Sequence, residues 1–502
     1  MDHLLYGRSN VLLVAGGLLS LFVVYQIVTA IHNAFFGPLS KYPGPLIRRF
    51  TIIPHALQIA QGEQHRDLER LHTRYGPVIR FGPNHVAFAG NHKTWKEIYG
   101  FRKGGVVPKD PMFYGTTVNG VHSIATTMDA TNHARQRKIF SNAFSDRALK
   151  AQEPLIKTWS VKLAEKLHER AASGEKTDML KYYNCTTFDI MGDLTFGESL
   201  NMLENSEYSH WVKTIFDGVK SASILRSLKF LGPIPAYLVD DVLFRTDMVR
   251  ERMMEHFSFT AERVDKRLAR KTDKPDIWSL LEDKDEEHGG LSLNEHHSNG
   301  NVFMIAGTET TATALSGTTY YLLQNPDIMA KLTAEVRSVA TSAEDLRLED
   351  LAKMKYLQAV LQEGLRMYPP ASIDLPRQVP HGGISIDGNF IPAGTKIGIA
   401  QYASYRMPEH FKDANEFHPE RWLGDPKYAN DNLDSVEPFS VGPRNCLGKN
   451  LAWHEMRILL ATVLLEFDLT LLPECNDWVD VQKVYTLWDK NPLWCTLTKA
   501  QR

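Results

Sequence analysis

The segment of residues 439–448 constrains this chain more than any other. It reads Phe-Ser-Val-Gly-Pro-Arg-Asn-Cys-Leu-Gly, and a long helical pattern begins directly behind it at Lys449. The free N–H groups and partial positive charge of a helix N-terminus lower the pKa of a nearby cysteine and stabilise its thiolate. The pattern therefore predicts that Cys446 is an anionic metal ligand. A buried, unreactive cysteine is the alternative.

The neighbours of this cysteine favour the ligand. Gly442 and Gly448 allow the backbone to approach a large flat group closely, and Phe439 can shield the sulfur from water. Arg444 can pair with an anionic group on the bound molecule. We expect these residues to line a cofactor site.

The spacing Phe-x-x-Gly-x-Arg-x-Cys-x-Gly resembles the haem-binding loop of the cytochrome P450 family. The resemblance implies that Cys446 is the axial thiolate of haem b (iron protoporphyrin IX), a ligand that favours cleavage of the O–O bond. Three further motifs precede the loop in the family's order: a threonine-containing helix, Glu-x-x-Arg and Pro-Glu-Arg. Together they imply a mainly α fold with a small β region, the cytochrome P450 fold, with haem between that helix and the cysteine loop.

The threonine-containing helix is predicted over residues 299–323 and reads Ala-Gly-Thr-Glu-Thr-Thr at 306–311. Gly307 costs about 1 kcal/mol relative to alanine inside a helix, so we expect a ligand to approach the backbone there. Thr310 and Glu309 resemble the family's oxygen-activation motif. Adjacent helical side chains diverge by about 100°, so Thr310 can face the haem while Glu309 faces a solvent channel. The alternative for Thr310 is a hydrogen bond to a carbonyl of its own helix.

Two sets of charged residues complete the motifs. Glu363 and Arg366 share one helix face, and with Arg421 they resemble the family's structural ion network behind the cysteine loop. Taken alone, such a pair is more often a weak surface ion pair.

The resemblance also implies that the haem propionates meet four basic residues. His133 and Arg137 stand where the family has Trp-x-x-x-Arg, and Arg377 and Arg444 complete the set. The alternative for the first two is an exposed basic helix face.

The N-terminus contains 21 uncharged residues at 11–31, long enough to cross a bilayer as a helix. A signal peptide would have a shorter apolar region of about 7–15 residues. Lys41, Arg48 and Arg49 follow the span and predict a cytoplasmic catalytic domain on a single-pass anchor in the endoplasmic reticulum membrane. The predicted division is an anchor at 1–36 (span about 11–31), a proline-rich connector at 37–49 and a haem-thiolate catalytic domain at 50–502. The apolar segment 230–238 either packs inward or dips into the membrane.

Composition limits the partners. The net charge of −2 gives no indication of nucleic acid binding, and the four cysteines form no C-x-x-C pair. Without a nucleotide-binding fingerprint, electrons for a monooxygenase must come from a separate NADPH-dependent flavoprotein reductase.

Segments at 75–85, 95–100 and 193–197 resemble the microsomal enzymes of filamentous-fungal secondary metabolism, of the isotrichodermin-hydroxylase type. That finer resemblance implies oxidation of an apolar small molecule, a polyketide or terpenoid, with O2. The alternatives are a haem-thiolate isomerase or dehydratase that needs no reductase, and a non-catalytic haem-binding sensor.

Overall fold

The computed structural model describes residues 2–242, 246–281 and 289–501, which form a mostly helical body with four small sheets. The predicted fold class, mainly α with a small β region, is confirmed. The helices are α1 (Asp2–Phe35), α2 (Leu46–Phe50), α3 (Ile53–Ala60), α4 (Gln64–Tyr75), α5 (His92–Tyr99), α6 (Ala130–Ser141), α7 (Asp146–Ser173), α8 (Met179–Phe196), α9 (Met202–Asn205), α10 (His210–Lys229), α11 (Pro233–Tyr237), α12 (Asp247–Ala269), α13 (Leu293–Gln324), α14 (Pro326–Arg337), α15 (Leu348–Leu351), α16 (Lys355–Met367), α17 (Gln401–Ser404) and α18 (Lys449–Glu466).

The strands gather into one four-stranded sheet and three smaller ones. Their bounds are β1 (Val78–Gly82), β2 (His85–Phe88), β3 (Thr177–Asp178), β4 (Arg377–Gln378), β5 (Ile384–Ile386), β6 (Asn389–Ile391), β7 (Lys396–Ile399), β8 (Phe467–Leu471), β9 (Lys483–Tyr485), β10 (Leu487–Asp489) and β11 (Trp494–Lys499). The largest sheet has the order β1-β2-β7-β4, in which only β2 and β7 run parallel. The β5–β6 hairpin turns at Asp387 and Gly388, both with positive φ, as an Asp-Gly turn requires.

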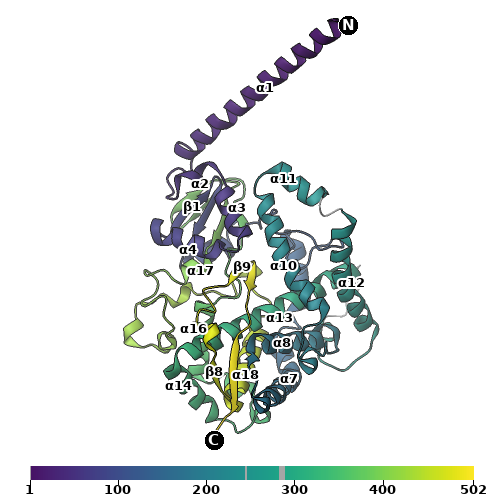
Figure 1. The fold of residues 1–502 in the computed structure, drawn as a ribbon, viewed down its shortest axis with the longest axis vertical. Coiled ribbons are helices and arrows are strands. Elements are labelled where there is room, and N and C mark those ends of the chain that lie inside the picture. Colours follow the sequence, from purple (N-terminus) through teal and green to yellow (C-terminus); the bar gives the residue numbers. More distant parts are fainter. Residues whose placement is uncertain (1, 243–245, 282–288, 502) are drawn as a thin grey trace.

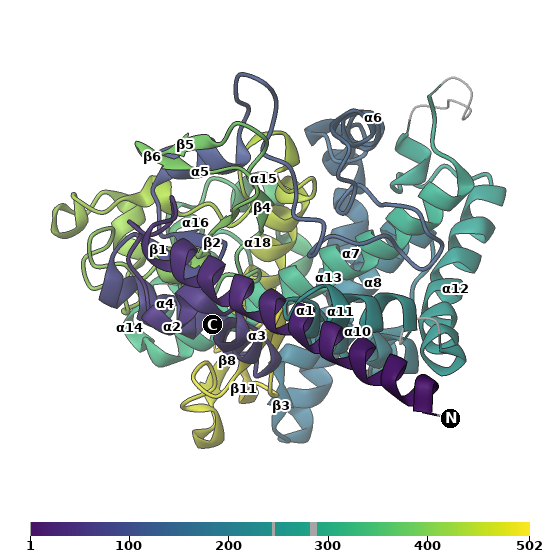
Figure 2. The same ribbon diagram turned by 90° about the horizontal axis from the view of Figure 1, so that it is seen from above.

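Helix α13 runs through the middle of the body and separates its two halves. The sheet with α2 to α5 lies on one side, and α7, α8, α10 and α12 lie on the other (Figure 2). The helix packs along α8 and also against α12, α16 and α18. Residues 311–320 are buried on every face, as is expected of a helix surrounded by protein. Its N-terminus is fixed by a capping box of Ser292 and Glu295, six residues before the predicted start.

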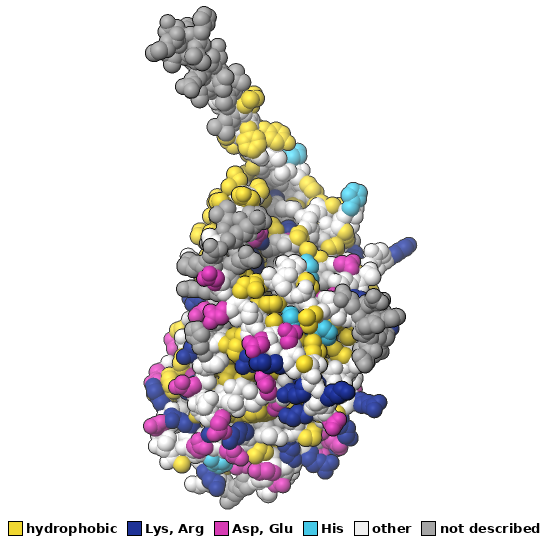
Figure 3. Space-filling model, turned by 90° about the vertical axis from the view of Figure 1, so that its right-hand side faces the viewer, with side chains coloured by type: hydrophobic (Ala, Val, Ile, Leu, Met, Phe, Trp, Pro, Cys, Tyr) yellow, Lys and Arg dark blue, Asp and Glu magenta, His cyan; other side chains and the backbone are white. Residues whose placement is uncertain are grey.

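Helix α1 projects away from the body, at the end opposite to the C-terminus (Figure 1). Within the described residues, one helical segment is long and apolar enough to cross a membrane: Gly16–Phe35, of mean hydropathy 1.6 and 6% buried. Other exposed apolar side chains gather below it (Figure 3). They come from α2, α3 and the α11 region: Leu46, Ile47, Ile53, Leu57, Leu231, Ile234, Tyr237 and Leu238. Segment 230–238 thus exposes apolar residues instead of packing them all inward.

The β9–β10 hairpin turns at an unusual residue. Residues 484–488 form most of this hairpin, and Thr486 at its turn has a φ of 71°. A β-branched residue rarely adopts this conformation, so the sequence carries no ordinary turn signal there.

Candidate active site

A cavity of about 410 Å³ lies between α13 and the loop that precedes α18. Ala306, Gly307 and Thr310 line it from α13, and Cys446 and Phe439 line it from the loop. The predicted threonine helix and cysteine loop therefore face the same space, although Thr310 and Cys446 are 136 positions apart in the sequence. Cys446 lies deep in the protein and is exposed to this cavity.

The two glycines of the cysteine loop serve different purposes. Gly442 has a φ of 77°, and a Cβ there would lie 2.4 Å from the Tyr99 carbonyl oxygen at the end of α5. Gly442 is absent from the lining of the cavity, and its close contact is with the protein backbone. Gly448 does line the cavity, and a Cβ there would meet nothing nearer than Phe144 at 4.0 Å.

Opposing effects determine the pKa of the Cys446 thiol. Burial raises its pKa above the usual value, while the Gly448 N–H, Arg137 and Lys449 act in the opposite direction. Burial prevails, contrary to the lowered pKa that the helix N-terminus predicts. A metal cation at the sulfur would reverse this balance, because a coordinating thiol is deprotonated outright.

Five basic side chains line one wall of the same cavity: Lys109, His133, Arg137, Arg377 and Arg444. None forms an ion pair within 4.0 Å among the residues that the structure describes. Arg137 donates to the Asn445 carbonyl (2.6 Å) and Arg444 to the Thr127 carbonyl (2.6 Å). Burial and the neighbouring cations lower the pKa of His133 to about 3.

Lys109 belongs to this group although the sequence gave no reason to select it. It lies in the irregular segment between α5 and α6, and its side chain lines the cavity. Its ammonium donates to the Ala125 carbonyl, and burial followed by repulsion from Arg444 and Arg377 lowers its pKa to about 6.

The cavity fits a haem. Burying several like charges together is costly unless an anion joins them. Arg377 shows this directly, because its Nε and Nη1 atoms are buried and have no hydrogen-bond partner among the described residues. The lining contains one carboxylic acid, Glu455, whose pKa burial raises to about 8. A flat group with a soft metal on one face and two carboxylates at its edge would satisfy Cys446 and the basic wall together.

On α13, Thr310 and Glu309 line different cavities. Thr310 faces the 410 Å³ cavity and donates to the Ala306 carbonyl at 2.7 Å, the bond to its own helix that the sequence left open. Glu309 faces a separate cavity of about 170 Å³, where it forms a buried ion pair with Lys490. Burial raises the pKa of Glu309 despite this partner, and its Oε2 has no hydrogen-bond partner among the described residues.

Gly307 has a packing reason that the sequence did not reveal. A Cβ there would lie 2.6 Å from the Met191 sulfur of α8. Both residues line the cavity, so the glycine lets α8 and α13 approach each other at its edge.

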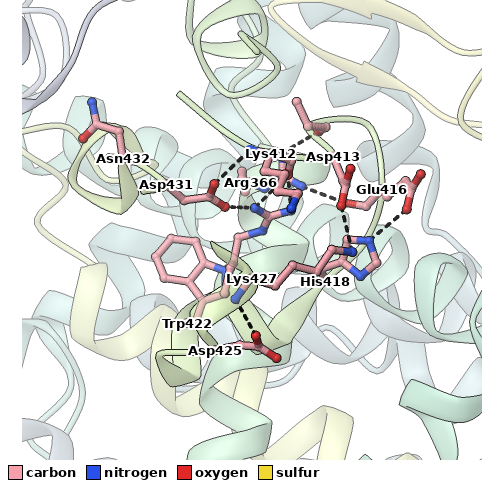
Figure 4. Close-up of polar contacts among 12 residues, drawn as sticks. Arg366, Lys412, Asp413, Glu416, His418, Trp422, Asp425, Lys427, Asp431 and Asn432 are labelled. Carbon is pink, nitrogen blue, oxygen red and sulfur yellow. Dashed lines mark hydrogen bonds and ion pairs between the residues drawn. The ribbon is translucent and has the colours of Figure 1, made fainter. Parts of the chain in front are cut away.

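The predicted ion network forms behind the loop and is fully buried. Arg366 and Arg421 lie 2.7 Å and 3.0 Å from Oε1 of Glu363, and their side chains have no exposed surface. Burial alone would raise the pKa of Glu363, but the two arginines hold it below its usual value. The sequence did not indicate two further members of this network, which Figure 4 labels: Trp422 and Asp431. Trp422 donates to Glu363 (2.9 Å), and Asp431 pairs with Arg421.

Comparison with known proteins agrees with this geometry. The family model described as cytochrome P450 matches residues 43–492. The chain is 45% identical to cytochrome P450 monooxygenase efuB of Hormonema carpetanum, over 97% of this chain and 96% of that protein. It is 41% identical to cytochrome P450 monooxygenase tpeC of Talaromyces stipitatus, over 96% and 94% of the two chains.

A third relative is the trichothecene C-15 hydroxylase of Fusarium sporotrichioides, 39% identical over 94% of this chain and 95% of that one. The matches run through the threonine helix, the buried network and the cysteine loop alike. The chain is therefore a member of the cytochrome P450 family and a monooxygenase.

Proposed function

We propose that this monooxygenase holds haem b through Cys446 and hydroxylates, or otherwise oxidises, an apolar small molecule of fungal secondary metabolism, a polyketide or terpenoid. Electrons come from NADPH through a separate flavoprotein reductase. The supporting observation is the single cavity that Cys446, Thr310 and the basic wall share. The hydroxylase named among its relatives supports the same class of reaction.

The wall residues bind and orient the cofactor. His133, Arg137, Arg377 and Arg444 would hold the two haem carboxylates, and Lys109 adds a further cation. Phe439 lines the cavity beside the cysteine and keeps water from the sulfur. When bound, haem supplies the iron at which dioxygen is activated.

Thr310 and Glu309 would transfer protons on the α13 side of the cavity. The Thr310 hydroxyl of α13 lines the cavity near Gly307, and it can pass a proton held on a water molecule. Glu309 lies one residue away and faces the second cavity, so it can hold a proton at its free Oε2 oxygen. Lys490 restrains that carboxylate until a proton arrives.

The location that fits these features is the endoplasmic reticulum membrane, with α1 as a single-pass anchor and the catalytic domain in the cytoplasm. Helices α2, α3 and α11 lie at the end of the body from which α1 projects (Figure 1), and their exposed apolar side chains would rest on the lipid surface.

The test measures product and hydrogen peroxide per NADPH in microsomes that contain the full chain and a reductase. Candidate polyketides and terpenoids are supplied with ¹⁸O2. We expect one ¹⁸O atom in the product of the wild type. Thr310→Ala should keep haem but lower product per NADPH several-fold, with the balance released as hydrogen peroxide.

Thr308→Ala is the matched control. Thr308 makes the same type of bond to its own helix, from Oγ1 to the Met304 carbonyl at 2.6 Å, but it does not line the cavity. It should leave the yield unchanged. Conversion of substrate without NADPH would instead favour the isomerase alternative, and coupled turnover in Thr310→Ala would remove that residue from the mechanism.

A further inference from the structure

A small cavity of about 30 Å³ lies between α3, α10, the β1–β2 hairpin and the β9–β10 hairpin. We call it the polar recess, because charged and imidazole side chains project into an otherwise apolar lining. The polar members are His55, Gln64, His85, Asp110, Ser223, Arg226, Asp374, Lys396 and Thr486.

The polar recess shares a wall with the active-site cavity. Phe113 lines the recess, whereas its neighbour Tyr114 lines the active site. In the same way, Pro376 lines the recess and Arg377 lines the active site. The rings of Phe113 and Tyr114 are in contact, 4.8 Å apart between centroids. These two rings therefore lie between the two spaces, and side-chain rotation on ligand binding is common.

Four polar atoms at the polar recess are buried and have no hydrogen-bond partner among the described residues: Nδ1 of His55, both ring nitrogens of His85 and Oδ2 of Asp110. His55 and Asp110 are 2% and 1% exposed. Buried polar groups are rarely left unpaired, so several such atoms around one space indicate a polar occupant.

Arg226 lies at the α10 side of the polar recess. One nitrogen donates to the Thr486 hydroxyl at 3.2 Å, and the guanidinium stacks on Phe113 at 4.0 Å. No carboxylate lies within ion-pair distance of it in the described part of the chain. The rest of its donor capacity is free to bind a ligand.

The charges of the polar recess determine the ligand. Lys396 pairs with Asp110, and Arg226 and Asp374 supply one further charge of each sign. Both histidines stay neutral, because burial lowers their pKa values, that of His85 to about 3. The net charge of the polar recess is therefore near zero, and the carboxylate of a ligand would add an uncompensated buried charge. A neutral hydroxyl can accept from Arg226 and donate to an aspartate, and 30 Å³ holds about one such group.

We propose that the polar recess binds a hydroxyl group of the substrate, remote from the carbon that is oxidised. The substrate class is then an apolar skeleton that already carries a hydroxyl. The inference rests on the proposed function only in placing the body of the substrate in the active-site cavity. An earlier reaction that installs or unmasks the hydroxyl must supply this molecule.

The experiment measures equilibrium binding of three matched probes to the full-chain haem protein in nanodiscs, with empty nanodiscs as blank. The probes are biphenyl, 4-phenylphenol and biphenyl-4-carboxylate. We expect 4-phenylphenol to bind about tenfold more tightly than either of the others, the value of one hydrogen bond to charged groups. Arg226→Met and Asp374→Asn should each bring the phenol-to-biphenyl ratio close to one.

Lys220→Met is the control. Lys220 lies on the same helix but pairs with Asp489 and lines the 170 Å³ cavity, so the ratio should not change. Each variant is first shown to bind haem by its reduced carbon-monoxide spectrum, and Asp374→Asn keeps the side-chain shape if Arg226→Met fails that check.

Equal affinities for all three probes, or no binding, would show that only water fills the polar recess. Tightest binding of the carboxylate would show an anion site and overturn the charge argument. Because the assay contains no NADPH or reductase, either result leaves the proposed oxidation to be judged by its own ¹⁸O2 test.

Discussion

The molecule contains two groups of buried charged residues that differ in their partners. In the network behind the cysteine loop, Arg366 and Arg421 both meet Glu363, and Arg421 also meets Asp431. In the active-site cavity, the five basic side chains of the wall have no carboxylate partner among the described residues. The network is fully buried and the wall is buried except for Arg137 and Arg444, which are half-buried, and the two groups differ in whether the chain itself supplies their counter-charges.

The difference indicates which charges serve the fold and which serve a ligand. A buried group of charges in which each has an opposite partner can support a rigid scaffold. A buried group without opposite partners is destabilising until a ligand of opposite charge binds. Proteins keep such local inconsistencies mainly where function requires them. The free nitrogens of Arg377 and the unpaired atoms of the polar recess belong to the second kind.

The largest expected effect comes from Cys446→Ser, which removes the ligand and leaves the network intact. The hydroxyl of serine is a poor substitute for a soft, anionic thiolate. We expect complete loss of the thiolate-type Soret band of the reduced carbon-monoxide complex, with a helical circular dichroism spectrum like that of the wild type. If the band persisted unchanged, the iron ligand would lie elsewhere.

Glu363→Gln and Arg377→Met separate the two kinds of buried charge. Glu363→Gln leaves two buried arginines without their shared partner and should destabilise the fold by about 3–5 kcal/mol, with little protein recovered. Arg377→Met removes a cation that has no ion-pair partner in the chain, so the fold should survive while the haem dissociates more easily. Denaturant unfolding and transfer of haem to an excess of apomyoglobin measure the two effects.

The opposite pattern would contradict this division. A stable Glu363→Gln protein would mean that the network is dispensable. Tight haem retention in Arg377→Met would mean that the other basic residues of the wall carry the binding without it.

The sequence predicts features that depend on local interactions better than features that depend on contacts between distant segments. Helix α16 and the β5–β6 hairpin with its Asp-Gly turn are the most readable elements, because local periodicity and turn chemistry determine both. The cysteine loop and α13 were identified through their motifs, and the cavity that they share could be expected only from the family resemblance.

Contacts between distant segments could not be predicted. Nothing in the local sequence shows that Lys490 meets Glu309 across 181 residues, or that Lys109 joins the basic wall. Gly307 and Gly442 also have packing reasons that the sequence could not show, because only the folded chain brings Met191 and Tyr99 near them. The turn at Thr486 has no local sequence signal, because its positive φ occurs at a β-branched residue, whose hydroxyl is hydrogen-bonded to the Ser223 hydroxyl and accepts from Arg226, both on α10.

The smallest expected effect is the contribution of Lys109 to the pH dependence of stability. Its pKa is about 6 in the folded chain without an anion, well below the usual 10.5, so unfolding takes up a proton between these values. The haem-free protein should therefore lose stability as the pH falls from about 10 towards 6, by up to about 1.4 kcal/mol per pH unit from this group. Lys109→Met removes that contribution.

The measurement compares urea midpoints of wild type and Lys109→Met at pH 7 and pH 9, with and without haem. Without haem, Lys109→Met should gain stability relative to the wild type at pH 7 and lose most of that gain at pH 9. With haem, the propionates supply the missing anions and hold the ammonium protonated, so the difference between the two pH values should vanish. A difference that persists in the haem-loaded protein would place Lys109 with the residues that serve the fold, and the basic wall would then consist of the other four residues alone.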